Sequence, residues 1–153
     1  MSYVLIIGAK SDIAKATAKV YAMHGYDLYL AARKPNELKG FANDVIAGSN
    51  INIKLVELDV VNYKSHQAFY ESLDEKPIGV IVAVGYLGKQ DEAQKNFVES
   101  QRIIDTNYFG LVSLLNIISN DFERRRNGFL TGISSVAGDR GRKRNYIYGS
   151  AKA

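Results

Sequence analysis

The chain has 153 residues, 46% hydrophobic and 24% charged, which is the composition of one globular domain large enough to bury a core. It has no cysteine, so disulfides, thiolate metal sites and thiol catalysis are excluded, and no apolar run is long enough to span a membrane. The net charge is +4, and the N-terminus shows no signal-peptide pattern, so we expect a cytoplasmic protein.

An apolar run at residues 3–7 predicts a buried strand, which is followed by a glycine turn and a helix to about residue 23. We expect this helix to turn one face to the core, made of Ile13, Ala16, Thr17, Val20 and Tyr21. A strand, a glycine turn and a helix in this order offer backbone N–H groups and a helix N-terminus to a phosphate.

The glycine turn departs from the Gly-x-Gly-x-x-Gly fingerprint, because only Gly8 fits and Lys10 and Ile13 take the other two places. A variant spacing, Gly-x-x-x-Gly-x-Gly, puts Asp12 and Ala14 at its second and third glycines. A carboxylate at position 12 would repel a pyrophosphate, so we expect Asp12 to cap the helix instead. No Walker sequence is present, which disfavours a P-loop.

The second strand, at residues 27–32, ends at Arg33. A site for NAD usually has an acidic residue at this strand end for the ribose hydroxyl, whereas a guanidinium suits the 2′-phosphate of NADP. Arg33 therefore favours NADP over NAD, and the alternative interpretation is a solvated loop residue.

The middle of the chain continues the alternation of helices and strands. A helix at 35–47 opens with a proline, and a strand at 51–58 ends in Asp59 and Val60. A helix at 65–73 and an apolar strand at 77–84 follow, and the strand ends in a turn at Gly85. Glycine lets a backbone approach a ligand closely at such a turn.

A long helix is predicted at 97–118, with Val98 and Tyr108 among its apolar positions, and a strand at 129–133 follows it. Asn107 lies in this helix, where an exposed polar position explains it as well as a functional one. The alternation predicts an α/β fold with a doubly wound parallel sheet, in one domain covering residues 1–153. His24 and His66 have no ligand-spaced partners, so we expect no metal site.

The C-terminal stretch carries a hydroxyl, a phenol and an ammonium that can form one proton-handling site. Tyr148 and Lys152 stand four apart, which puts them one turn apart on one face of a helix. Ser135 lies just after the fifth strand, at the sheet edge where open α/β sheets bind ligands. A Tyr-x-x-x-Lys pair by itself is better explained as a surface pair.

Five features in chain order resemble the short-chain dehydrogenase/reductase family across the whole sequence. They are the glycine turn, Asp59 with Val60, the Gly85 turn, Asn107, and Ser135 with Tyr148 and Lys152. The thirteen-residue spacing from Ser135 to Tyr148 is that of the family. The resemblance implies a Rossmann-type fold and an NAD(P)H-dependent reduction of a carbonyl substrate.

The family pattern implies roles for the cofactor-binding positions. Gly8, Lys10 and Ser11 would hold the phosphates, with Asp12 and Ile13 completing the same turn. In addition, Arg33 would hold the 2′-phosphate, Asp59 and Val60 would contact the adenine, and Gly85 would lie near the ribose. The usual Asn-Asn-Ala-Gly is replaced here by the sequence at 82–85.

The resemblance also implies the chemistry. Tyr148 would donate a proton to the substrate oxygen as hydride arrives from the cofactor, and Lys152 would lower the pKa of the phenol and bind the ribose. Ser135 would hold the substrate oxygen, and Asn107 would position a water that leads to Lys152. The chain would be the N-terminal part of such an enzyme, without the later strands and the substrate lid, and a complete protein would form a homo-oligomer.

Within the family, the sequences at 11–14, 84–88 and 134–152 look like the decaprenylphosphoryl 2-keto-ribose reductase branch, which implies a polyprenyl-phosphate-linked ketosugar as substrate. Two basic runs, at 124–126 and 140–144, are interpreted as solvated surface, with a substrate phosphate or peripheral membrane contact as the alternative. No nucleic-acid motif accompanies them. The competing interpretations are a non-catalytic dinucleotide-binding module, an inactive fragment of such a reductase and, more weakly, a flavodoxin-like or response-regulator domain.

Overall fold

The computed structural model describes residues 2–153 and contains one parallel sheet of five strands. The strand order is β3-β2-β1-β4-β5. The strands are β1 Tyr3–Ile7, β2 Asp27–Ala32, β3 Ile53–Glu57, β4 Gly79–Val82 and β5 Phe129–Gly132. All four pairings are parallel, so the predicted doubly wound, Rossmann-type sheet is confirmed.

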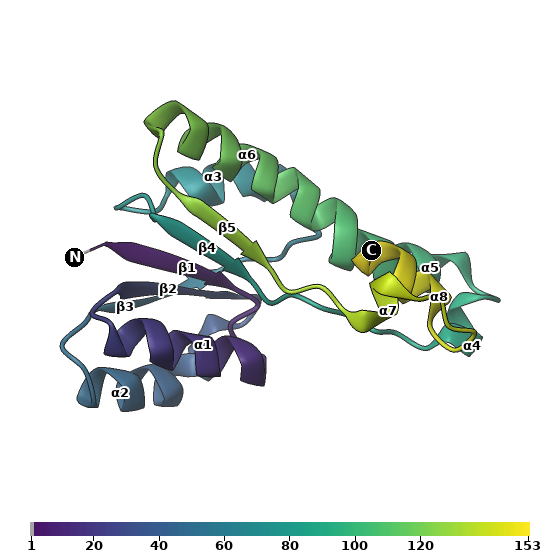
Figure 1. Cartoon of the computed structure of the whole chain (residues 1–153), viewed down its shortest axis with the longest axis horizontal. Helices are drawn as coiled ribbons and strands as arrows, with labels where there is room; N and C mark the ends of the chain where they lie inside the picture. Colours follow the sequence, from purple (N-terminus) through teal and green to yellow (C-terminus); the bar gives the residue numbers. More distant parts are fainter. Residues whose placement is uncertain (1) are drawn as a thin grey trace.

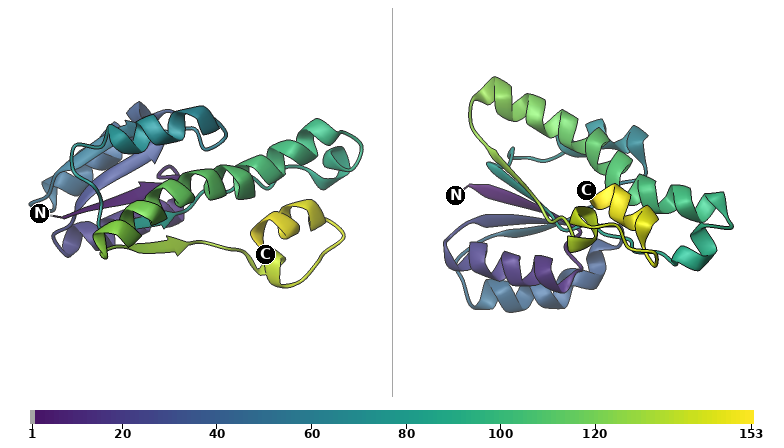
Figure 2. Two further views of the ribbon diagram at one scale, coloured as in Figure 1. Left: turned by 90° about the horizontal axis from the view of Figure 1, so that it is seen from above. Right: turned by 45° about the vertical axis from the view of Figure 1, so that its right-hand side comes forward.

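Helices cover both faces of the sheet and also gather beyond its carboxyl ends (Figure 1). The α-helices are α1 Asp12–Met23, α2 Lys39–Ala47, α3 His66–Glu71, α4 Gln90–Ala93, α5 Phe97–Ile104, α6 Gly110–Arg125, α7 Val136–Asp139 and α8 Tyr146–Lys152. Short 3-10 turns, η1 Pro35–Leu38 and η2 Tyr63–Ser65, lead into α2 and α3, and a π turn, η3 Asp105–Phe109, joins α5 to α6. The two views of Figure 2 show α5, η3 and α6 as one long rod.

The sheet separates two hydrophobic cores because successive residues of a strand point to opposite faces. Val4 and Ile6 of β1 pack in the core beneath α1 and α2. Leu5 and Ile7 pack in the other core, against α3 and α6. The three central strands are buried along their whole length, as the apolar runs in the sequence predict, whereas the edge strand β3 is mostly half-buried and the edge strand β5 is exposed.

Helix α1 packs with a different face from the one predicted. Its buried residues are Ala14, Ala18 and Ala22, whereas Ile13 and Val20 are 59% and 53% exposed. Small side chains let the helix approach the sheet closely, and the larger apolar residues are left on its outer side. The prediction followed side-chain hydrophobicity and was wrong for Ile13 and Val20, because a close approach favours small residues in the contact, whereas Tyr21 is partly buried and packs against this core.

The long helix extends further than predicted, to Arg125, and the π turn interrupts it at Asp105–Phe109. Two positions assigned to its buried face are exposed, since Val98 is 71% and Tyr108 49% accessible. Asn107, in contrast, is buried, with only 3% of its surface exposed. The interpretation of Asn107 as an exposed polar residue is therefore wrong. His66 is fully buried against Ser113, whose hydroxyl lies 3.0 Å from its Nδ1, so this histidine is a packing residue.

The basic run at 124–126 has a structural role in part. The Arg124 and Arg125 guanidinium groups donate to the Asp121 carboxylate at 2.6 and 2.8 Å, and Arg125 also donates to the Pro77 carbonyl at 3.0 Å.

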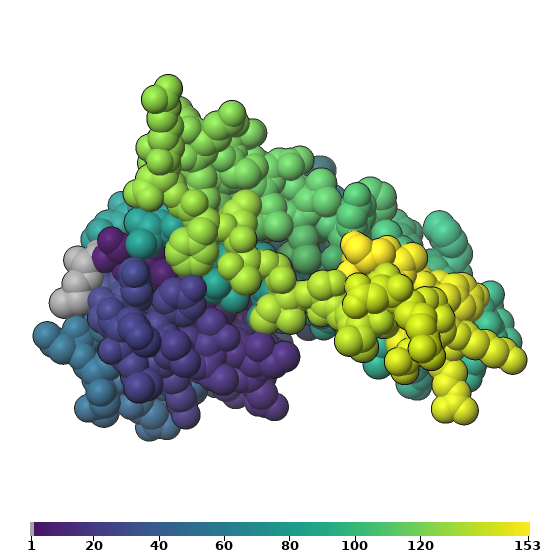
Figure 3. Space-filling view, viewed as in Figure 1, coloured from purple at the N-terminus to yellow at the C-terminus, as the bar shows by residue number. Residues whose placement is uncertain are grey.

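Within residues 2–153, no helix has the length and apolar character needed to cross a membrane. In the space-filling view, the C-terminal segment with α7 and α8 projects beyond the sheet (Figure 3).

Candidate active site

The glycine turn after β1 has a backbone conformation that requires glycine at position 8. Gly8 has a φ of +81°, and a Cβ built on it would lie 2.8 Å from the carbonyl carbon and oxygen of Ala83. A side chain is therefore excluded where the turn crosses the end of β4. Ser11 caps α1, because its Oγ accepts from the Ala14 N–H at 3.2 Å, so the prediction that Asp12 is the cap is wrong.

A cavity of about 630 Å³ runs along the carboxyl ends of β1, β2, β3 and β4 and reaches α5 and η3. Seven of the nine residues predicted to bind the cofactor line it. They are Gly8, Lys10, Ser11, Arg33, Asp59, Val60 and Gly85. Asp12 and Ile13 lie outside this lining, exposed in the first turn of α1.

Three cations line the end of this cavity nearest β2. Arg33 and Lys34 follow the strand and are exposed, while the Lys10 ammonium forms an ion pair with Glu37 of η1. The hydrogen bond and charge of Lys10 lower the pKa of the Glu37 carboxyl. A phosphate that enters here would meet Arg33, Lys34 and the ion pair of Lys10 with Glu37.

Asn107 holds the turn that follows β4. Its Oδ1 accepts from the Tyr86 N–H at 3.1 Å, and its Nδ2 donates to the Tyr86 carbonyl at 2.7 Å and the Ile103 carbonyl at 2.8 Å. Asn107 lies in the π turn, and its side chain faces the segment that follows β4. The Ile103 carbonyl that it also contacts lies one turn earlier in the same rod of helices. Both polar atoms of the amide are therefore used to fix the wall of the cavity at Gly85 and Tyr86.

Lys152 is 9% exposed, and its ammonium donates to the Val84 carbonyl at 3.0 Å and the Ile133 carbonyl at 2.9 Å. These carbonyls follow β4 and β5, so the ammonium joins two neighbouring strand ends. Burial lowers the pKa of Lys152, because it disfavours the charged form. Val84 lines the cavity, and Lys152 therefore lies directly behind its wall.

Ser135 and Tyr148 lie on the two short helices that close the chain. Ser135 is the N-cap of α7, with its Oγ accepting from the Ala137 N–H at 3.2 Å. Tyr148 is half-buried in α8, and within residues 2–153 its hydroxyl has no hydrogen-bond partner. The helices touch closely, because a Cβ on Gly149 would lie 2.5 Å from the Ala137 carbonyl oxygen.

Arg102 is among the residues of the cavity lining that the sequence interpretation missed. The Arg102 guanidinium lies 4.2 Å from the centre of the Tyr86 ring, and both residues line the cavity. Glu99 fixes the arrangement by accepting from the Tyr86 hydroxyl at 2.7 Å. The signal available was the i, i+3 spacing of Glu99 and Arg102 on a helix, which is too common to indicate a site by itself.

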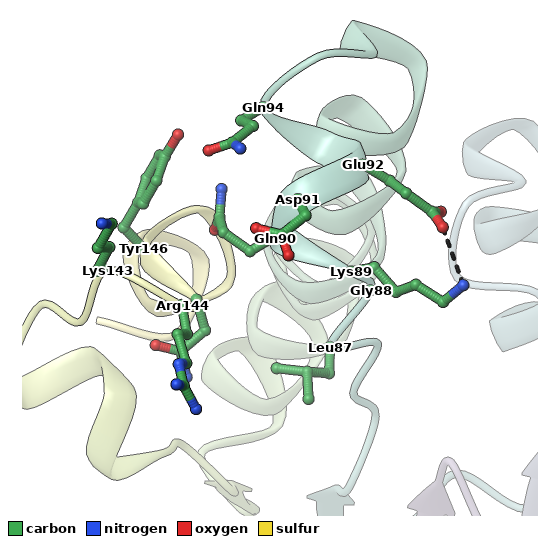
Figure 4. A pocket seen from close by; sticks show the side chains of 11 residues that line it. Leu87, Gly88, Lys89, Gln90, Asp91, Glu92, Gln94, Lys143, Arg144 and Tyr146 are labelled. Atoms are coloured by element: carbon green, nitrogen blue, oxygen red, sulfur yellow. Dashed lines mark hydrogen bonds and ion pairs between the residues drawn. The ribbon is translucent and has the colours of Figure 1, made fainter.

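A second cavity, of about 1120 Å³, lies between α4 and the loop that precedes α8 (Figure 4). Most of the residues that line it are polar types, among them Gln90, Asp91, Arg144 and Tyr146, and Leu87 is an apolar member. Only Lys143 and Arg144 of the C-terminal basic run reach it. Neither cavity includes Ser135 or Tyr148 in its lining.

Comparison with known proteins identifies the family to which this fold and site belong. The family model of the short chain dehydrogenases matches residues 2–153. The chain belongs to the short-chain dehydrogenase family. That assignment excludes the flavodoxin-like and response-regulator alternatives.

Two relatives of this chain are named as uncharacterized oxidoreductases. An uncharacterized oxidoreductase of Mycobacterium tuberculosis is 35% identical over 153 residues, covering 98% of this chain and 61% of the relative. Another, from Myxococcus xanthus, is 30% identical over 158 residues, covering 100% and 62% of the two chains. The chain thus spans about 61% of the length of these relatives. Neither relative is named as a decaprenylphosphoryl 2-keto-ribose reductase.

Solved structures share the fold. A short-chain dehydrogenase from Sphingobium yanoikuyae in complex with NADPH superposes with a TM-score of 0.88 at 24% identity, covering 99% of this chain and 61% of that one. A bulky-bulky ketone specific alcohol dehydrogenase from Comamonas testosteroni gives a TM-score of 0.88 at 21% identity, with 99% and 62% covered.

Proposed function

We propose that this protein reduces a ketone to an alcohol with NADPH as cofactor, and that Tyr148 donates the proton. The observation that carries the proposal is the anchoring of Lys152 on the carbonyls of Val84 and Ile133. This anchoring fixes the C-terminal end of α8 to the strand ends beside the cavity, and Tyr148 precedes Lys152 by one turn in the same helix. The family assignment favours this enzyme over a module that only binds a nucleotide.

The residues of the cavity fit a dinucleotide. Gly8 lets the turn pack directly against the backbone that follows β4, and Lys10 and Ser11 of this turn line the cavity, where they would hold phosphate oxygens. Asp59 and Val60 line the position expected for the adenine, and Gly85 the position expected for the ribose. Asp12 and Ile13 would contribute to the turn through their backbone only. The nicotinamide cofactor, when bound, supplies the hydride.

The protein side chains would handle the proton. The Tyr148 hydroxyl would give its proton to the substrate oxygen, and Lys152, one turn later in α8, would supply the positive charge that favours the resulting phenolate. Ser135 would hold the same oxygen through its hydroxyl. Asn107 would act at the cavity wall, and the water that we expect it to position would lead to Lys152.

Replacement of Tyr148 by Phe tests the assignment. The variant keeps the ring and loses the proton, so we expect turnover to fall by about a hundredfold or more while NADPH still binds. Turnover is measured on the mass-verified natural gene product as loss of NADPH absorbance. Tyr26→Phe, at a half-buried tyrosine outside both cavities, is the control. Near-normal turnover of Tyr148→Phe would remove Tyr148 from the mechanism.

The preference for NADPH rests on Arg33, with Lys34 beside it and no carboxylate at the end of β2. Arg33→Ala removes a charge-assisted contact to the 2′-phosphate, so we expect NADPH affinity to fall about ten- to a hundredfold and NADH affinity to change little. Isothermal titration with both cofactors measures this difference. An equal loss for both cofactors would contradict a role at the 2′-phosphate.

The substrate class that we propose is a hydroxylated ketone, with a polyprenyl-phosphate-linked ketosugar as the specific candidate. We expect the second cavity to receive the hydroxyl groups of the substrate, because residues with carboxylate and guanidinium groups are part of its lining (Figure 4). A panel of dihydroxyacetone, erythrulose and cyclohexanone tests it. We expect the two hydroxyketones to be reduced faster, and faster reduction of cyclohexanone would overturn the substrate class but not the reductase.

A further inference from the structure

Helix α8 carries both proposed proton-handling residues, yet its own sequence caps it poorly. Its N-cap residue, Asn145, makes no side-chain hydrogen bond to the first turn. The Ile147 N–H, which such a cap would satisfy, instead donates to Gln90 Oε1 at 3.1 Å. The cap of α8 therefore comes from another helix, 57 residues earlier in the chain.

Gln90 links α8 to the helices α4 and α5. It is 8% exposed and opens α4, and Figure 4 shows its side chain extending from this short helix. Helix α4 is itself fixed to α5, because the Ser100 hydroxyl donates to the Ala93 carbonyl at 2.6 Å. The bond from Gln90 to Ile147 thus ties α8 to the rod formed by α5, η3 and α6.

The other end of α8 is fixed to the sheet through Lys152 and the carbonyls of Val84 and Ile133. Tyr148 lies between these two attachments, next to Ile147 in the chain. A helix of seven residues has too few internal bonds to hold its own direction, so these two attachments, together with the packing of α7 against Gly149, place the Tyr148 ring.

We infer that Gln90 is a positioning residue for Tyr148, acting through its Oε1 on the first turn of α8. This inference rests on the proposed role of Tyr148. Gln90 acts only through Oε1, since its Nε2 is buried and has no hydrogen-bond partner within residues 2–153. The same burial keeps Nε2 from contacting a substrate in the adjacent cavity.

The use of a single oxygen gives a sharp test with two nearly isosteric substitutions. Gln90→Glu keeps the acceptor, and Gln90→Met removes it at similar volume. We expect Gln90→Met to lower kcat by about ten- to a hundredfold, the scale expected for a misplacement of about 1 Å, with KM and NADPH affinity within about threefold of the unmodified protein. Gln90→Glu should keep kcat within about threefold. Gln101→Met, at an exposed glutamine of α5 outside both cavities, is the control and should change nothing.

The measurements use the natural gene product and the panel ketone that it reduces fastest, with NADPH affinity and thermal unfolding recorded for every variant. Near-normal kcat in Gln90→Met, or equal losses in Gln90→Glu and Gln90→Met, would overturn the inference. If Gln90→Met does not fold, Gln90→Asn, which is one methylene too short, takes its place. Failure of both to fold would make Gln90 purely structural and would also overturn it. Normal turnover in Tyr148→Phe would instead refute the proposed function.

Discussion

Glu37 contributes a carboxylate to the end of the cavity where we propose that the cofactor phosphates bind. Its carboxylate pairs with Lys10 at the phosphate end of the cavity, and both groups line that cavity. A bound phosphate must compete with Glu37 for the ammonium and also lies near a like charge. Glu37→Gln removes the competitor, so we expect NADPH to bind roughly two- to fivefold more tightly at low salt.

Isothermal titration at two salt concentrations measures this gain, which should shrink as salt rises. Glu123→Gln, at an exposed glutamate of α6 far from the cavity lining, controls for the change in net charge. A weaker affinity of Glu37→Gln for NADPH would show that the Lys10–Glu37 pair organises the site instead of competing with the cofactor.

Asn107 illustrates what the sequence leaves open at the scale of one residue. An asparagine among apolar neighbours in a helix has two explanations, exposure or a buried site with specific partners. The partners are backbone groups of Tyr86, 21 residues away, and of Ile103. Sequence periodicity carries no information on such long-range backbone contacts, so only the family resemblance gave Asn107 a role.

At the scale of elements, the strands and the larger helices could be predicted because their apolar patterns are set by burial. The buried face of α1 could not, since the close packing of Ala14, Ala18 and Ala22 depends on the distance between helix and sheet. Helix α4 was also missed. It has four residues and no long apolar pattern, and it is fixed by contacts such as Ser100 to Ala93 that connect separate segments.

Helix α6 is tied to α3 through one buried carboxylate. Asp121 accepts from the Tyr70 hydroxyl at 2.7 Å and from Arg124 and Arg125, and its side chain is 8% exposed. Burial by itself would raise the pKa of Asp121, but these hydrogen bonds and charges outweigh it and lower the pKa. Asp121→Asn should reduce the free energy of unfolding at pH 7 by about 2 kcal/mol, measured by urea denaturation.

The pH dependence of that loss follows from the sign of the shift. A carboxyl with a lowered folded pKa stabilises the fold above its unfolded pKa of about 4 and loses this contribution as the pH falls through the folded value. The difference between Asp121→Asn and the unmodified chain should therefore shrink below about pH 4. Asp44→Asn, at an exposed position of α2, should show little difference at any pH. A constant difference down to acid pH would contradict the assignment.

At the scale of the whole molecule, segments far apart in the sequence meet at one edge of the sheet. The turns after four strands, α5 and the π turn line one cavity, and Lys152 bridges the two strand ends beside it. The sequence predicted this convergence because parallel strands bring their carboxyl ends together. It could not predict that the C-terminal helices would project beyond the sheet, since α7 and α8 are too short to show a pattern (Figure 1).

A ligand that spans this edge should stabilise the whole chain. At a concentration of 100 times its dissociation constant, NADPH would add about 2.7 kcal/mol to the free energy of unfolding. For a domain of this size we expect Tm to rise by roughly 5–10 °C, and by less with NADH at the same concentration because Arg33 and Lys34 would gain no phosphate. Differential scanning fluorimetry of the 153-residue chain measures both shifts, with sodium phosphate at matched ionic strength as control. No shift with either cofactor would contradict dinucleotide binding in the cavity, and a larger shift with NADH would reverse the cofactor preference.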